Sequence, residues 1–123
     1  ATQATKQALE DEKLEKLPIA QFNENPLKVY QGTLASGDKF IGDIATLTQM
    51  AIEIENLFAV DMESAAVAHV CMDFDTPYVA IRVISDKADG TAHIDFLAFT
   101  QQLASPLDAL IIEKLIPLIP SVL

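Results

Sequence analysis

The pattern of apolar and polar positions predicts strands and helices that follow one another along the chain. Three short segments have the composition of β-strands: residues 27–34 (LKVYQGTL), 57–60 (LFAV) and 78–84 (YVAIRVI). The third is almost wholly apolar and rich in β-branched residues, which is typical of a strand covered on both faces in a parallel sheet. Helices are predicted around them, over residues 1–16 and 43–53, from the end of Asp61-Met62-Glu63 to about residue 74, and over 93–119, the last with a restart or kink at Ser105-Pro106.

This alternation of strands and helices predicts an α/β fold. Right-handed crossovers between parallel strands give a three-layer sandwich, with a mostly parallel central sheet flanked by helices. One face of the helix after residue 60 is expected to pack in the core, because it carries Ala66, Val67, Val70, Cys71 and Phe74 at helical spacing. At 123 residues the chain has room for one domain of this kind.

Short polar side chains follow each predicted strand. They form three clusters: Ser36-Gly37-Asp38, Asp61-Met62-Glu63 and Ser85-Asp86. If the strands are parallel, these clusters lie on the same edge of the sheet, where open α/β sheets bind their ligands. Apolar surface for the resulting acidic cleft would come from Phe40, Met62 and Phe96.

Each cluster also has a plainer interpretation. Asp61 and Glu63 could cap a helix and complement its dipole, which is worth about 0.3–1 kcal/mol per charge. The other two clusters could be ordinary turns. The equivalent places of all three favour a site, and so does Arg82, because a guanidinium in an apolar strand is costly without a carboxylate partner.

Composition narrows the classes of partner. The chain has 18 acidic against 8 basic residues and a formal charge of −10, which argues against nucleic acid or an anionic membrane as partner. A single cysteine, Cys71, excludes a disulfide framework and suits a reducing compartment, so we expect a cytoplasmic protein. His69 and His93 lack the spacing of zinc ligands, and no metal site is expected.

Three segments resemble a known family. SGDKFI (36–41), VDMESAAVAHV (60–70) and VAIRVISDKADG (79–90) are similar, in order and spacing, to the carboxyl-terminal half of bacterial 5′-methylthioadenosine/S-adenosylhomocysteine nucleosidases, members of the nucleoside phosphorylase superfamily. The likeness runs from about residue 27 to residue 99. It implies a partial nucleoside phosphorylase-like fold and hydrolysis of the bond between adenine and a 5′-thioribose, with no metal or organic cofactor.

The resemblance also implies a role for each candidate residue. Two carboxyl groups are the catalytic pair: Glu63 would accept hydrogen bonds from the ribose hydroxyls, and Asp86 would protonate the leaving purine. This suits the chemistry, because breaking an N-glycosidic bond leaves a cation-like sugar and pushes electrons onto the base. The remaining residues would form the substrate-binding site. Phe40 would stack on adenine, the backbone of Ile41 would read the edge of the base, and Met62 would pack under the ribose. Ser85 would support Asp86, Arg82 would hold in place the acidic cluster that includes Asp61, and Phe96 would line the 5′-thioalkyl pocket. The family commonly has Glu where this chain has Asp61.

Members of this family are longer than this chain. The resemblance implies that residues 1–123 are the carboxyl-terminal portion of a single domain, without the amino-terminal half that carries the water-activating glutamate. We therefore expect the 123-residue chain to be inactive alone. Homodimerisation is also implied, and a small thio-nucleoside is the expected substrate.

Three other functions remain open at this point. A purine nucleoside phosphorylase would use phosphate where a nucleosidase uses water, although ISDKAD and SGDKF look more like the nucleosidase. A non-catalytic nucleoside-binding relative would tolerate loss of Glu63 or Asp86, and both are present. A purely structural module, in which every acid is a cap, predicts no adenine binding.

Overall fold

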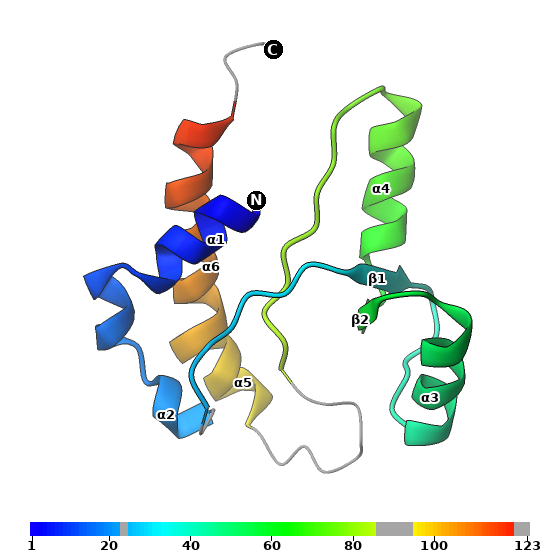
Figure 1. The fold of residues 1–123 in the computed structure, drawn as a ribbon, viewed down its shortest axis with the longest axis horizontal. Helices are drawn as coiled ribbons and strands as arrows, with labels where there is room; N and C mark the ends of the chain where they lie inside the picture. The colour runs from blue at the N-terminus through cyan, green and yellow to red at the C-terminus, as the bar shows by residue number, and fades with distance from the viewer. Residues whose placement is uncertain (23–24, 86–94, 120–123) are drawn as a thin grey trace. The chain divides into compact units, whose positions relative to one another are not determined.

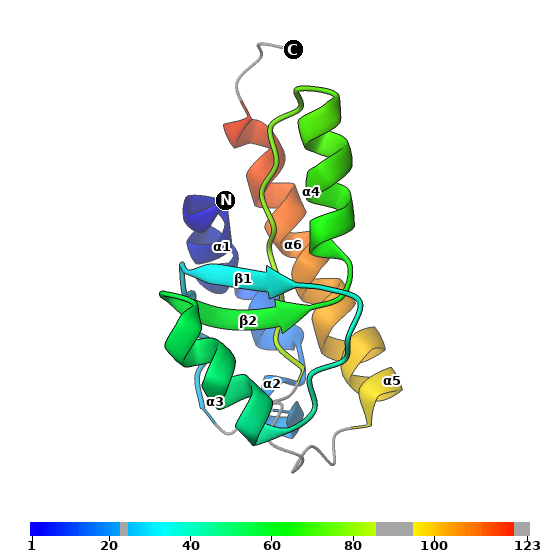
Figure 2. The same ribbon diagram turned by 90° about the vertical axis from the view of Figure 1, so that its right-hand side faces the viewer.

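A computed structural model describes residues 1–22, 25–85 and 95–119. The chain divides into two compact units. The terminal unit combines Ala1–Val29 with His93–Leu123, and the central unit is Tyr30–Ala92. Figures 1 and 2 show the elements of each unit in two perpendicular views. No helix in the described part of the chain has the length and hydropathy needed to span a membrane.

The terminal unit is helical. Its amino-terminal elements are α1 (Thr2–Leu9), the 3-10 helix η1 (Glu12–Lys16) and α2 (Ile19–Phe22). Its carboxyl-terminal elements are α5 (Phe96–Phe99), the π-helical turn η2 (Thr100–Ala104), α6 (Ser105–Leu115) and the 3-10 helix η3 (Ile116–Leu118). The restart predicted at Ser105-Pro106 is confirmed, since α6 begins at Ser105 with the proline in its first turn.

The core of the terminal unit lies between α1 and the helical run from α5 to α6. This run buries one continuous face: Phe99, Leu103, Leu107, Leu110 and Ile111. On α1 the buried residues are the small Ala4 and Ala8, so the α1 and α6 backbones can approach closely. Two ion pairs join the amino-terminal elements to α6: Lys13–Glu113 at 2.9 Å and Lys114–Asp11 at 2.5 Å.

The amino-terminal helix is shorter than predicted. Instead of running to residue 16, it ends at Leu9, and a 3-10 turn begins at Glu12. The physical reason is local, because the carboxylate of Asp11 accepts the backbone N–H of Lys13 at 2.9 Å and caps a new turn.

The central unit contains a small parallel sheet and two helices. Its elements are β1 (Thr33–Ser36), α3 (Ile44–Glu53), β2 (Leu57–Asp61) and α4 (Ser64–Asp73). β1 and β2 pair in parallel, with Leu34 opposite Ala59 and Ser36 opposite Asp61. In both views α3 and α4 lie on opposite sides of this strand pair (Figures 1 and 2). The α/β class and the parallel pairing are thus confirmed, whereas the three-layer sandwich stays a prediction.

The third predicted strand is not formed. Residues 78–84 have no ladder partner among the described residues, and they run as an extended segment after α4 (Figure 1). Three of their apolar side chains are exposed, Tyr78 by 41% and Val79 and Ile84 each by 58%, and the others are half-buried. The prediction was wrong because apolar composition permits a doubly covered strand but forms one only where a neighbouring strand and covering helices exist. The first strand is also displaced, from residues 27–34 to Thr33–Ser36.

The central unit buries little apolar surface. The expected core face of α4 is exposed instead, with Val67, Val70 and Phe74 at 49%, 57% and 77%. Cys71, expected in that core, is half-buried. The reason is that β1 is the main contact of α4, so most of its face has no partner. Within the described part of the central unit, Ser64 is the one buried residue, with 5% of its surface exposed.

Candidate active site

The site begins at the carboxyl ends of the two parallel strands. Ser36 ends β1, Asp61 ends β2, and the two residues are partners in the sheet register. The backbone N–H of Gly37 continues the contact by donating to the carbonyl oxygen of Asp61 at 3.2 Å. Two of the three polar clusters predicted from the sequence therefore share one edge of the sheet, as expected.

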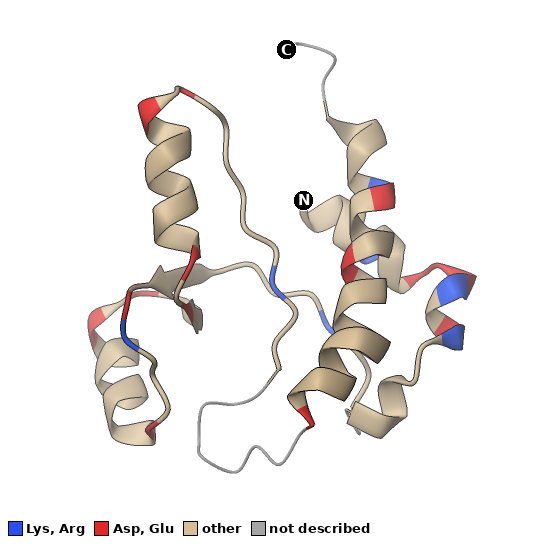
Figure 3. Cartoon of the chain, turned by 180° about the vertical axis from the view of Figure 1, so that it is seen from behind, with Lys and Arg blue, Asp and Glu red and all other residues tan. Residues whose placement is uncertain are grey.

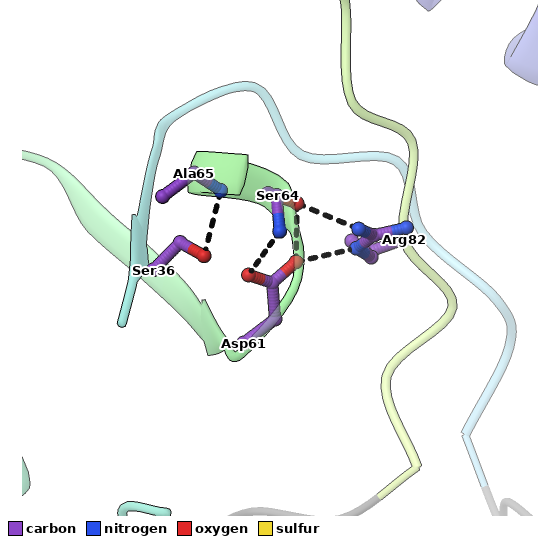
Figure 4. Close-up of polar contacts among 5 residues, drawn as sticks. All are labelled: Ser36, Asp61, Ser64, Ala65 and Arg82. Atoms are coloured by element: carbon purple, nitrogen blue, oxygen red, sulfur yellow. Dashed lines mark hydrogen bonds and ion pairs between the residues drawn. The ribbon is translucent and has the colours of Figure 1, made fainter. Parts of the chain in front are cut away.

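Asp61 is held by a set of hydrogen bonds that we call the Asp61–Ser64–Arg82 triangle (Figure 4). The Nε of Arg82 donates to Asp61 Oδ2 at 2.7 Å, and the Nη2 of Arg82 donates to Ser64 Oγ at 2.6 Å. The Ser64 hydroxyl closes the triangle by donating to Asp61 Oδ2. The triangle thereby bonds the extended segment that carries Arg82 to the end of β2.

The other carboxylate oxygen of Asp61, Oδ1, caps α4. It accepts the backbone N–H of Ser64 at 3.1 Å, and the Ser36 hydroxyl accepts the backbone N–H of Ala65 at 2.9 Å (Figure 4). These bonds satisfy two of the free N–H groups in the first turn of α4. The helix-capping interpretation of Asp61 is therefore correct, and the ion pair with Arg82 is a second role of the same side chain.

The electrostatics favour the ionised form of Asp61. Its side chain is only 12% exposed, and this burial alone raises the pKa. The hydroxyls of Ser36 and Ser64 and the guanidinium of Arg82 outweigh burial and hold the pKa of Asp61 well below its usual range. Asp61 therefore acts as a fixed negative charge at this edge of the sheet.

Glu63 is in the opposite situation. It occupies the N-cap position of α4 but makes no side-chain hydrogen bond there, and no ion pair joins it to the described residues. Both Glu63 and its neighbour Met62, which is 44% exposed, face solvent. The capping interpretation does not hold for Glu63.

Phe40 and Ile41 lie in the loop that leaves β1 and leads to α3. The ring of Phe40 is 74% exposed and rests over the backbone of Gly42, where an added Cβ would lie 2.5 Å from Phe40 Cε1. Ile41 is half-buried. The loop ends at Asp43, whose Oδ1 accepts the N–H of Thr46 at 2.8 Å and begins α3. A flat, accessible aromatic face suits stacking on a planar base.

The remaining candidate residues are Ser85, Asp86 and Phe96. Ser85 is half-buried at the end of the extended segment, three residues after Arg82. Asp86 and His93 lie outside the described residues. Phe96 begins α5 in the terminal unit and is 68% exposed. Across the described ranges no group of three or more His, Cys, Asp or Glu residues is placed to hold a metal ion.

Acidic and basic residues are distributed over both units (Figure 3). In the central unit the acidic side chains at the strand ends have one basic partner, Arg82, among the described residues. Sequence reasoning predicted this pairing in general terms but missed Ser64. The available signal was its spacing, since Ser64 lies three residues after Asp61 and therefore in the first turn of the helix that Asp61 caps.

The chain belongs to the Phosphorylase superfamily, whose profile matches residues 2–117. Three similar proteins are each named 5′-methylthioadenosine/S-adenosylhomocysteine nucleosidase. The protein from Bacillus subtilis (strain 168) is 40% identical over 95 residues, which cover 76% of this chain and 41% of that protein. The protein from Haemophilus influenzae (strain PittEE) is 36% identical over 107 residues, covering 87% and 47%. The protein from Actinobacillus succinogenes is 42% identical over 89 residues, covering 72% and 39%.

These relatives are longer proteins, and this chain spans less than half of their length. No solved structure matched the chain.

Proposed function

We propose that this chain is part of a nucleosidase that hydrolyses the N-glycosidic bond of 5′-methylthioadenosine and S-adenosylhomocysteine. The products are adenine and the thioribose sugar. Support comes from the names of the similar proteins and from one observation in the site. At the shared edge of β1 and β2, Asp61 is fully engaged with Ser64 and Arg82, whereas the adjacent Glu63 has no partner in the described chain. In this proposal Asp61 holds the structure at the ends of the strands, and Glu63 contacts the substrate.

The proposed reaction needs two carboxyl groups with different roles. Water adds to C1′ of the ribose while the C1′–N9 bond breaks, and its electron pair passes to adenine. Glu63, as a carboxylate beside the ribose hydroxyls, stabilises the positive charge that develops on the sugar. Asp86 donates a proton to the imidazole side of the leaving purine. The role of Asp86, with its support from Ser85, is proposed from the family resemblance.

Substrate contacts complete the proposal. The exposed ring of Phe40 stacks on adenine while the backbone of Ile41 reads its edge, and Met62 packs under the ribose. Phe96 lines the 5′-thioalkyl pocket, and Arg82 holds Asp61 at the base of the site. We further propose that residues 1–123 are the carboxyl-terminal portion of a single domain and that the complete enzyme is a cytoplasmic homodimer. The water-activating base then lies outside these residues.

Adenine release by the complete encoded protein tests the proposal. Either thio-nucleoside should yield adenine without phosphate. Glu63→Gln and Asp86→Asn should each lower kcat/KM by about 10²-fold or more, because each removes a group that acts in the transition state. Glu55→Gln is a matched control, since this exposed residue precedes β2 at the opposite end of the strand. Turnover that requires phosphate would identify a phosphorylase, and adenine binding without turnover would identify a non-catalytic relative.

A further inference from the structure

Ser64 is a polar residue, and among the described residues of the central unit it alone is buried. It is 5% exposed, while its neighbours Glu63 and Ala65 are exposed. Burying a hydroxyl costs free energy unless its hydrogen bonds are made, and this hydroxyl makes both of its strong bonds with charged partners. It donates to Asp61 and accepts from Arg82. A residue that only fills space would need neither bond.

The Ser64 hydroxyl is the second acceptor of the Arg82 guanidinium. A guanidinium has a rigid fork of donors, which commonly binds both oxygens of one carboxylate. Here Arg82 bonds one oxygen of Asp61, Oδ2, through Nε, while Oδ1 accepts the backbone N–H of Ser64. The second donor of the guanidinium, Nη2, donates to the Ser64 hydroxyl oxygen at 2.6 Å. The Ser64 hydroxyl therefore stands where the second carboxylate oxygen stands in the common two-oxygen pair, and two different side chains accept from the guanidinium.

The same bonds fix the turn that carries Glu63. Met62 and Glu63 are the two residues between Asp61 and Ser64, and they have no side-chain tether of their own among the described residues. Both ends of this two-residue turn belong to the Asp61–Ser64–Arg82 triangle. We propose, resting on the function proposed above, that Ser64 is a positioning residue that orders Arg82 and, through it, the turn presenting Glu63 to the ribose.

A spectroscopic experiment tests the order at Arg82 without any assay of activity. Arg82 is the only arginine in the 123 residues, so ¹⁵N-arginine labelling of this chain gives a single guanidinium spectrum. We expect slow rotation about the Cζ–Nη2 bond in the native chain and rotation at least tenfold faster in Ser64→Ala. Ser64→Thr, which keeps the hydroxyl, should restore the slow rotation. Equal rotation rates in the native chain and Ser64→Ala would overturn the proposal.

A double-mutant cycle on kcat/KM in the complete encoded protein tests the consequence for substrate. Ser64→Ala alone should lower kcat/KM about tenfold, and Ser64→Thr should stay within about threefold of the native protein. In an Arg82→Lys background, where the fork is absent, Ser64→Ala should cost less than about twofold. An equal loss in both backgrounds would mean that Ser64 acts through folding alone, and would overturn the positioning role.

Two controls keep the outcomes distinct. Ser64→Cys preserves the volume of the side chain while weakening both hydrogen bonds, and it replaces Ser64→Ala if the alanine variant does not fold. If the native protein releases no adenine, the proposed function fails. The rotation experiment then still decides whether Ser64 orders Arg82.

Discussion

Ser36 and Asp61 lie opposite each other at the carboxyl ends of β1 and β2, and each of their side chains bonds the first turn of α4. Ser36 accepts from Ala65, and Asp61 accepts from Ser64. The described central unit has no fully buried apolar residue that could locate this helix by packing. Side-chain hydrogen bonds at the sheet edge therefore locate the start of α4, and with it Glu63.

Loss of Arg82 should destabilise the central unit. Arg82→Met leaves the carboxylate of Asp61, 12% exposed, without its cation. The free energy of unfolding should fall by about 1–3 kcal/mol, because a largely buried charge loses a hydrogen-bonded partner. Urea unfolding followed by circular dichroism measures the change. Lys39→Met removes an exposed cation from the same unit and should change stability by less than about 0.5 kcal/mol. Similar losses in the two variants would contradict this account of the ion pair.

Stability should also decline in acid, and Asp61 should account for part of the decline. Its pKa is lowered in the folded chain, so its stabilising contribution is complete above the unfolded pKa of about 3.9. That contribution is lost as the pH falls from there towards the folded pKa. Asp61→Asn should therefore be less stable than the native chain at about pH 6, and the difference should shrink towards about pH 2.

A control is needed because other carboxyl groups titrate in the same range. Hydrogen bonds from Thr46 lower the pKa of Asp43, which is exposed to solvent. Solvent screening weakens such an exposed interaction, so Asp43→Asn should alter the pH dependence less than Asp61→Asn does. Urea unfolding at several pH values compares the two variants. Parallel curves for Asp61→Asn and the native chain would show that the Asp61 bonds contribute no pH-dependent stability.

The parallel strand pair could be predicted from the sequence because it depends on local signals. The runs predicted at residues 27–34 and 57–60 are each followed by polar residues and then a helix, and this order places both strand ends on one edge, although the first strand forms at Thr33–Ser36. Residues 78–84 gave a stronger apolar signal and yet form no strand. Apolar composition shows that a segment could form a buried strand. Whether the strand forms depends on a neighbouring strand that supplies its backbone hydrogen bonds.

The site could be predicted only in part for a similar reason. Arg82 is a charged residue in an otherwise apolar segment, and such a charge is costly without a partner, so the sequence predicted that Arg82 pairs with a carboxylate. This pairing is confirmed. The division of roles between Asp61 and Glu63 could not be read, because both acids stand at the start of the same helix. Which one caps α4 depends on side-chain geometry, and that geometry selects Asp61.

The cap of α3 should matter for the loop that carries Phe40. Asp43→Ala removes the bond from Thr46 N–H, at 2.8 Å, and should lower the melting temperature, because a helix N-terminus loses its cap. Asp43→Asn retains a side-chain oxygen and should lower it less. Thermal unfolding compares the variants. A loss in Asp43→Asn as large as that in Asp43→Ala would mean that charge, rather than the hydrogen bond, holds this helix end.

The position of the Phe40 ring can be changed without altering the ring itself. In Gly42→Ala the new Cβ would lie 2.5 Å from Phe40 Cε1, so the ring must move. The fold should tolerate this, because the clashing atom is at the far end of an exposed side chain. Adenine stacking should weaken, since an aromatic pair contributes about 0.5–1.5 kcal/mol beyond its buried area.

The measurement is the dissociation constant of adenine for the complete encoded protein, by isothermal titration calorimetry. Gly42→Ala should raise it about two- to tenfold, which is the stacking free energy expressed as an affinity ratio. Gly37→Ala is the matched control in the same loop, because a Cβ there meets no atom within 4 Å. It should bind adenine as the native protein does. If Gly42→Ala binds adenine with the native dissociation constant and its melting temperature is unchanged, Phe40 does not stack on the base. The adenine-binding site then lies elsewhere on the molecule.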